Sequence, residues 1–229
     1  MFGLVGAEAP SSRSSERRSY SVAELVADGA IHVLGLIVAL AAGSALLAIA
    51  ALDTAPEAFP VLLIYVLTLV TVLSVSLAYN LWPRSAVKHY LARFDQAAIF
   101  LFIAGTYTPF LAIMGGTPLC WIMGSLVWGA ALVGVGLKLI VPERFGRMAI
   151  LLYLGIGWSC VLIFQVLAQY LPPTTLWLLL AGGITYSAGI VFHLWERLKF
   201  QNALWHVFVV AGASLHLWAV IDCMVVARL

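Results

Sequence analysis

The chain has 229 residues, of which 63% are hydrophobic and 10% charged, and its mean hydropathy is +1.05. So few charged residues exclude an ordinary soluble domain of this length, in which about 25% of the residues are charged. The formal net charge of +2 does not indicate a nucleic-acid partner, because the basic residues sit in short loops between apolar segments.

Seven apolar segments follow one another along the chain, most of them long enough for a transmembrane helix of about 20 residues. A membrane-spanning chain must satisfy its backbone internally, as helices or as a closed barrel. The segments are continuous rather than alternating in polarity, which excludes a barrel. We therefore predict an all-α, seven-helix membrane bundle over residues 20–229. Its first span runs over about 31–52, and the later spans are bounded near Asn80, Asp95, Lys138, Gln169, His193, Asn202 and Arg228.

The N-terminal part of the chain is polar and precedes the first span. Residues 1–19 are rich in Ser and Arg and lack the long apolar core of a signal peptide, so we predict a disordered cytoplasmic tail. Ser21 followed by Glu24 fits a helix cap in which the acid occupies the third helical position. We expect that helix to lie at the membrane interface before the first span begins near His32.

The basic residues give the orientation of the bundle. The N-terminal tail and the regions that follow spans two, four and six hold 11 of the 12 Lys and Arg residues, and the exception is Arg228. Cytoplasmic loops carry the excess of Lys and Arg in membrane proteins. The N-terminus is therefore predicted to be cytoplasmic, the C-terminus is predicted outside, and the cytoplasmic (inner) membrane is the expected location.

Polar residues gather at the cytoplasmic ends of three predicted spans. Asn80 closes the second span, Asp95 opens the third, and Asn202 and His206 lie one helical turn apart at the start of the seventh. Each side chain taken singly has a structural explanation as a helix cap or a hydrogen-bonded core residue. Because polar groups are costly when they face lipid, four of them at one depth indicate a site inside the bundle.

Four passages of the sequence carry a family resemblance. They are Tyr20–Glu24, Ser76–Asn80, Phe94–Phe110 and Asn202–Gly212, of which the last opens with Asn-Ala-Leu-Trp-His. Through them the chain resembles bacterial hemolysin III proteins, in the superfamily of progestin and adipoQ receptors, and more distantly alkaline ceramidases. The resemblance extends from Tyr20 to about Val226.

The resemblance implies a zinc ion held by a His that closes the second span and by two His residues that open the seventh. A Ser and an Asp support that ion. Carried over, the Ser is Ser76, the Asp is Asp95 and the last His is His206, but Asn80 and Asn202 occupy the other two ligand positions. An amide oxygen is a weak ligand for zinc, which prefers imidazole or thiolate. We therefore expect no metal at this constellation.

Two alternatives describe what replaces that zinc ion. A buried carboxylate needs a partner, so Asp95 is expected to accept a hydrogen bond from Ser76, Asn80 or Asn202, with His206 nearby. In the other alternative His32 and His193 rebuild a zinc site together with His206 and Asp95. The remaining histidines, His89 and His216, are expected to be structural.

These alternatives lead to different functions. The first is a hemolysin III-like protein with a degenerate zinc site and a sensing, membrane-homeostasis or cytolytic role, although no row of polar residues spans any segment as a pore would require. The second is a zinc-dependent membrane lipid hydrolase of the amidase or ceramidase kind. A retinal-binding protein is disfavoured because the seventh span contains no Lys. Membrane lipids are the expected partners in each case.

Overall fold

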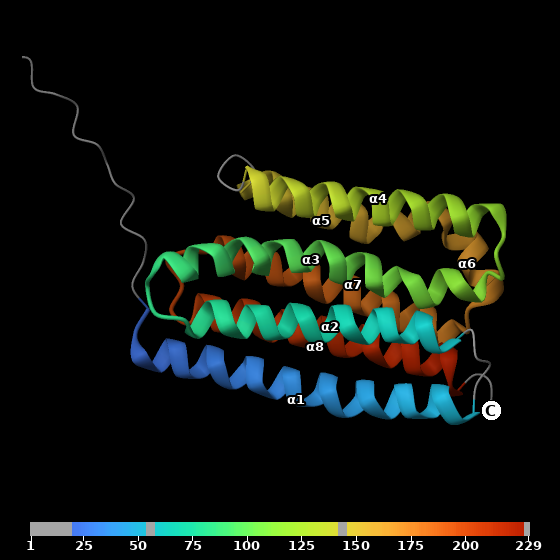
Figure 1. Cartoon of the computed structure of the whole chain (residues 1–229), viewed down its shortest axis with the longest axis horizontal. Coiled ribbons are helices and arrows are strands. Elements are labelled where there is room, and N and C mark those ends of the chain that lie inside the picture. The colour runs from blue at the N-terminus through green and yellow to red at the C-terminus, as the bar shows by residue number, and fades with distance from the viewer. Residues whose placement is uncertain (1–19, 54–57, 142–145, 227–229) are drawn as a thin grey trace, which may run out of the picture.

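The structure is a computed structural model that describes residues 20–53, 58–141 and 146–226. The predicted N-terminal tail lies outside these residues. The described chain is helical throughout, and Figure 1 shows its helices running side by side. They are α1 (Val22–Asp53), α2 (Ala58–Leu81), α3 (Ala86–Ile113), α4 (Pro118–Ile140), α5 (Gly146–Trp158), the 3₁₀ helix η2 (Ser159–Ile163), α6 (Phe164–Tyr170), α7 (Pro173–Leu194) and α8 (Gln201–Met224).

Seven segments of the described chain are long and apolar enough to cross a membrane, which confirms the predicted seven-helix bundle. Six of the spans are single α-helices, namely α1, α2, α3, α4, α7 and α8. The fifth span in chain order consists of α5, η2 and α6 together. Large apolar side chains such as Trp121, Leu162 and Trp177 are exposed on the outside of the bundle. A lipid environment accommodates these side chains, because it removes them from water.

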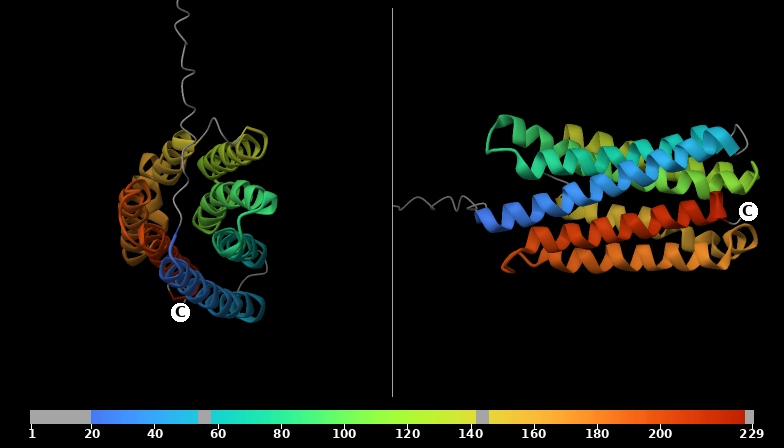
Figure 2. Two further views of the ribbon diagram at one scale, coloured as in Figure 1. Left: turned by 90° about the vertical axis from the view of Figure 1, so that its left-hand side faces the viewer. Right: turned by 90° about the horizontal axis from the view of Figure 1, so that it is seen from below.

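Helix α1 joins the two sides of the bundle. It packs against both α2 and α8, while α2–α3–α4 form one series of neighbours and α7–α8 the other. The view along the bundle in Figure 2 shows α2, α3 and α4 on one side, α7 and α8 on the other, and α1 at the edge between them. The start of α1 therefore lies next to the start of α8.

The predicted interfacial helix and the first span are a single element. Helix α1 continues without a break from Val22 to Asp53. Its start has the predicted cap: the backbone N–H of Ser21 donates to the Glu24 carboxylate at 2.9 Å, and the N–H of Glu24 donates to the Ser21 hydroxyl at 3.3 Å. The helix that begins at Val22 and the predicted first span at about 31–52 are therefore continuous, because nothing between Ser21 and His32 ends the helix.

The third span also begins earlier than predicted. Ser85 caps α3 by accepting a hydrogen bond from the backbone N–H of Lys88, and the helix runs from Ala86 through Pro109 to Ile113. Asp95 therefore lies in the third turn of the helix, not at its first residue. This position excludes the interpretation of Asp95 as the helix cap.

The fifth span is interrupted where the sequence predicts a continuous helix. The chain passes from α5 into η2 at Ser159, and the Tyr107 hydroxyl of α3 reaches this break. That hydroxyl lies 2.8 Å from the carbonyl of Ile156, and the backbone N–H of Cys160 donates to it at 2.9 Å. A side chain of another helix thus satisfies backbone groups that the change of helix type leaves without α-helical partners.

The predicted orientation can be tested with reporter fusions. Reporters placed after Arg18 and after Leu229 should report opposite faces of the membrane, with the N-terminal fusion in the cytoplasm, because seven is an odd number of spans and 11 of the 12 basic residues lie on one side. A phosphatase and a fluorescent protein, which are active on opposite faces, provide the paired readout. The same face for both fusions would contradict this topology.

Candidate functional site

A cluster of polar side chains lies inside the bundle where the start of α1, the end of α2 and the start of α8 meet. Asp28 and His32 come from α1, Ser76 and Asn80 from α2, and Asn202 and His206 from α8. Asp28 is 2% exposed and His32 1% exposed. The cluster therefore belongs to the interior of the protein and not to its lipid-facing surface.

Asp28 is the acid at the centre of this cluster. His206 Nδ1 lies 2.6 Å from Asp28 Oδ1, and the Asn202 amide donates to Asp28 Oδ2 at 2.9 Å. Both carboxylate oxygens are thus engaged by side chains of α8. Because a buried carboxylate without partners is costly, these two contacts stabilise Asp28 and hold α1 against α8.

His32 connects Asp28 to α2. Its Nδ1 lies 2.8 Å from the backbone carbonyl of Asp28, one turn earlier on the same helix, and its Nε2 lies 3.1 Å from the Ser76 hydroxyl. A carbonyl can only accept, so Nδ1 carries the proton in this contact. The His32 and His206 rings pack edge to face with centroids 4.1 Å apart.

The two asparagines at the predicted ligand positions bind each other. The Asn202 amide donates to Asn80 Oδ1 at 2.9 Å, and the Asn80 amide donates to the backbone carbonyl of Ser76 at 2.9 Å. The structure thus brings Ser76, Asn80, Asn202 and His206 together, as the sequence predicted for the constellation. The Asn80 oxygen, which would have to ligate a metal, is occupied by an amide donor.

Asp95 has one of the three hydrogen-bond partners predicted for it, Ser76. Asp95 interacts with the Ser76 side chain from the α3 side, whereas Asn202 donates to Asp28 and to Asn80. Of the three donors predicted for Asp95, Ser76 makes the interaction, whereas the Asn202 amide donates to Asp28. Sequence reasoning missed Asp28, although its spacing of four residues from His32 was a readable signal of two side chains on one helical face.

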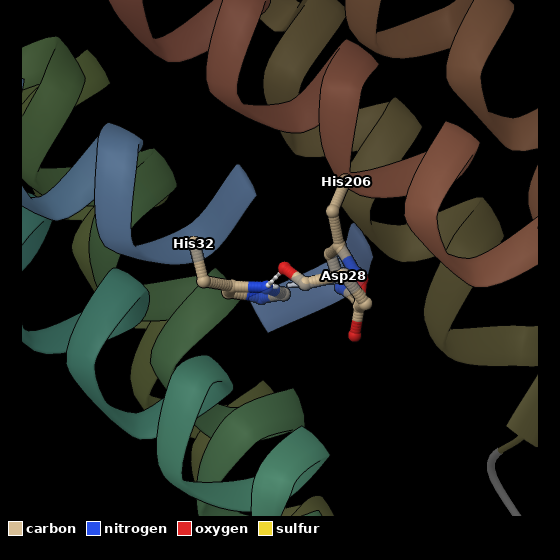
Figure 3. Close-up of side chains that lie close together, drawn as sticks. All are labelled: Asp28, His32 and His206. Carbon is tan, nitrogen blue, oxygen red and sulfur yellow. Dashed lines mark hydrogen bonds and ion pairs between the residues drawn. The ribbon is translucent and has the colours of Figure 1, made fainter. Parts of the chain in front are cut away.

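The other histidines lie elsewhere in the bundle. The His193 ring packs against Trp205 with centroids 4.9 Å apart, and His193 is not among the residues whose ligand atoms converge. His216 lies deeper in α8, with Nε2 3.3 Å from the Leu179 carbonyl, and His89 contacts Arg93 at 3.0 Å. The residues that converge are Asp28, His32 and His206, shown in Figure 3, in place of the predicted set with Asp95 and His193.

The polar cluster forms part of the wall of a large cavity. The cavity has a volume of about 1650 Å³ and extends from the end of the bundle that carries the cluster into its centre. Its apolar lining includes Val72, Phe102 and Ile103, and its polar wall includes His32, Ser76, Asn80, Asp95, Asn202 and His206. A molecule inside it would touch many polar groups at the end that carries the cluster and mainly apolar side chains along the rest of its length, where Thr106 and His216 are among the polar exceptions.

Replacing Asp95 by alanine tests how far this side chain stabilises the α2–α3 pair. We expect a loss of about 1–3 kcal/mol of unfolding free energy, because the Ser76 side chain loses a partner away from bulk water. Thermal unfolding in detergent with a chelator present measures the change. Asp95→Asn is the control, since it keeps the size and an acceptor oxygen and should lose less. An Asp95→Ala variant that melts at the parent temperature would show that the contact is dispensable.

The sequence of the chain is similar to those of known proteins of one family. Residues 22–217 match the sequence profile of a family described as haemolysin-III related. Hemolysin-3 of Bacillus cereus is 32% identical over 205 residues, which cover 90% of this chain and 94% of the relative. The Hemolysin-3 homolog of Bacillus subtilis (strain 168) is 31% identical over 204 residues, which cover 88% and 95%. The human monocyte to macrophage differentiation factor is 29% identical over 163 residues, which cover 69% and 67%.

Proposed function

The chain belongs to the haemolysin-III-related family, and on that premise we propose that it is a multi-pass protein of the cytoplasmic membrane that binds an amphiphilic lipid in its central cavity. The polar group of the lipid lies against the cluster around Asp28, and its chain extends along the apolar lining. The role is the sensing or homeostasis of membrane lipid.

The cavity is the observation that carries this proposal. Its volume of about 1650 Å³ exceeds the range of about 300–1,000 Å³ that is typical of small-molecule pockets. Its lining is mainly apolar, and its charged and amide side chains are most numerous at the bundle end that carries the cluster, while fewer polar residues, such as Thr106 and His216, line its deeper part. This distribution of polar and apolar groups is complementary to an amphiphile, whose polar group and chain lie at opposite ends.

The hydrogen bonds of the cluster support a role that does not use the zinc ligands implied by the family resemblance. Asn80 and Asn202 hold each other through an amide–carbonyl hydrogen bond, and amide oxygens bind zinc weakly. The residues at these two positions therefore do not fit the zinc ion that the family resemblance implies. The two asparagines instead fit a polar cavity wall, in which an amide group can exchange one hydrogen-bond partner for a polar group of the lipid.

Lipid binding can be measured with a pair of matched substitutions. Ile103→Trp places a larger side chain on the cavity wall in α3, whereas Ile184→Trp makes the same change at an exposed position of α7 that does not line the cavity. Native mass spectrometry of the purified full-length protein should show retained lipid in the parent and in Ile184→Trp, and much less in Ile103→Trp. Equal retention in all three proteins, or none in the parent after addition of membrane lipids, would contradict the proposal.

A second candidate function is zinc-dependent hydrolysis of a lipid amide. The convergence of Asp28, His32 and His206 on the cavity side of the bundle favours it. A zinc ion held there would supply Lewis acidity for attack of water on the amide carbonyl. Release of fatty acid from a ceramide by the purified protein, dependent on added zinc and absent with a chelator, would support hydrolysis. Lipid retention without release under both conditions would leave binding as the function.

A further inference from the structure

We infer that Asp28, His32 and His206 form a binding site for one divalent transition-metal ion, with two of the three ligands supplied by α1. The site uses a different ligand set from the one that the family resemblance implies, because only His206 is common to both. It shares a wall with the proposed lipid cavity but does not depend on lipid being bound.

The ligand atoms of these residues converge. One ligand atom from each of the three side chains can be chosen so that all lie within 4.8 Å of one another, and all three residues are buried. Asp28 and His32 are four residues apart and share one face of α1, and Figure 3 shows His206 of α8 pointing towards them. Two ligands on one helical turn and a third from a facing helix form the framework of a chelating site.

The surroundings orient the ligands as a metal requires. His32 Nδ1 is held by the Asp28 carbonyl at 2.8 Å, so Nε2, which lies 3.1 Å from the Ser76 hydroxyl, is the atom that would exchange this hydroxyl for an ion. The Asn202 amide holds Asp28 Oδ2 at 2.9 Å, which leaves Oδ1 facing the two imidazoles. Supporting hydrogen bonds of this kind, from a carbonyl to a ligating His and from an amide to a ligating carboxylate, fix the donor atoms of metal sites. Asn202 therefore acts as a supporting residue and not as a ligand.

Charge and access also fit a cation. The Asp28 side chain is 3% exposed, and its Oδ1 lies 2.6 Å from His206 Nδ1 and 3.8 Å from His32 Nδ1, so one carboxyl group and two imidazoles meet away from water. His32 and His206 line the cavity, whereas Asp28 is not among its lining residues. An ion held by the three side chains would thus have its remaining coordination positions directed into the cavity.

The donor set indicates the class of metal. Two imidazoles and one carboxylate suit zinc and the other first-row divalent ions such as iron(II), cobalt(II) and manganese(II). Calcium and magnesium prefer oxygen ligands alone and are disfavoured. No thiolate takes part among the described residues of the cluster, so copper(I) is disfavoured as well.

The test measures metal on the full-length protein purified in detergent. The protein is stripped with a chelator, incubated with zinc, freed of unbound ion and analysed for metal per chain. The parent should retain one ion per chain and melt several degrees higher with zinc than with chelator. Asp28→Asn and His32→Gln should lose both the ion and the shift. His193→Gln, which changes a histidine at the same end of the bundle but outside the triad, should keep both.

A second measurement guards against variants that fail to fold. X-ray absorption at the zinc edge of the loaded parent should show only nitrogen and oxygen ligands, with two imidazole rings. Asn80→His/Asn202→His is the positive control, since it adds two ligands beside His206. The inference is overturned if that control binds zinc while the parent does not, if a folded Asp28→Asn variant retains the full ion, or if the spectrum contains sulfur or fewer than two imidazoles. Lipid retention is scored separately, so loss of metal does not decide the proposed function.

Discussion

Replacing Asp28 by alanine should destabilise the bundle by about 3–5 kcal/mol, since removal of one partner from a buried charged pair leaves the other groups uncompensated. The carboxylate is 2% exposed and holds His206 at 2.6 Å and Asn202 at 2.9 Å. Both partners belong to α8, so the variant loses a polar connection between α1 and α8. The resulting cavity adds a further penalty that hydrophobic contacts elsewhere do not offset.

Thermal unfolding in detergent with a chelator present measures this effect apart from any metal. For a protein of 150–250 residues, about 2–4 °C of melting temperature corresponds to 1 kcal/mol, so the expected fall is roughly 6–20 °C. Asp28→Asn is the matched control, because an amide of the same shape can accept from Asn202 and donate to an unprotonated nitrogen of His206. It should lose less than Asp28→Ala. A fall of less than about 2 °C in Asp28→Ala would mean that the carboxylate contributes little to folding.

A double-mutant cycle separates the pair from its surroundings. Asp28→Ala and His206→Ala, made singly and together, should be non-additive by about 1.5–3 kcal/mol, the range of a hydrogen bond to a charged group. Additive losses would assign the stability to packing of the two side chains and not to their contact. The same cycle with Asn202→Ala in place of His206→Ala measures the interaction energy of the Asn202 amide with Asp28 Oδ2.

The sequence predicted the bundle because the signals for its spans are local. Apolar runs of about 20 residues and loops rich in basic residues can each be read without knowledge of the neighbouring helices. The proximity of Asn80, Asn202 and His206 could also be predicted, since each lies at a helix end on the same side of the bundle. The same reasoning found the Ser21–Glu24 cap at the start of α1.

Asp28 could not be placed from hydropathy because an acid at the start of an apolar run lowers the hydropathy there. Hydropathy therefore predicts a first span that begins after Asp28, near Ile31, with the acid in the interfacial part of the helix. The structure shows that α1 is continuous and that His206 and Asn202 of α8 satisfy the Asp28 carboxylate inside the bundle. These partners lie more than 170 positions away in the sequence, so the spacing of Asp28 and His32 could indicate a shared helical face but not the side chains that satisfy the carboxylate.

The break in the fifth span and the cavity have the same non-local origin. The 3₁₀ segment at Ser159–Ile163 depends on the Tyr107 hydroxyl from α3, and nothing within the segment itself shows that such a partner exists. The cavity is lined by residues of α2 and α3 on one side of the bundle and of α7 and α8 on the other. The distance between neighbouring helices depends on how their side chains pack, and the hydropathy pattern that locates the spans contains no information about this packing.

The close contact of α2 with α3 predicts a large loss of stability when Gly105 is replaced by a residue with a side chain. A Cβ atom added to Gly105 would lie 2.0 Å from Thr68 Oγ1 and 2.9 Å from Thr68 Cβ. The Thr68 hydroxyl is held by the carbonyls of Ile64 and Tyr65 at 3.0 Å and 2.9 Å, so it cannot move aside without losing a hydrogen bond. Only the absence of a side chain at Gly105 allows the two helices to approach this closely.

Gly105→Ala should therefore lower the unfolding free energy by about 1–3 kcal/mol, the usual penalty for overpacking, which corresponds to roughly 2–12 °C in detergent. Gly129→Ala in α4 is the matched control, because its Cβ would meet no atom within 4 Å. Since alanine is favoured over glycine in a helix by about 1 kcal/mol, this control should be neutral or stabilising. Thr68→Ala should partly rescue Gly105→Ala by removing the nearest atom. Equal melting temperatures for Gly105→Ala and Gly129→Ala would show that α2 and α3 do not pack as closely as their backbones indicate.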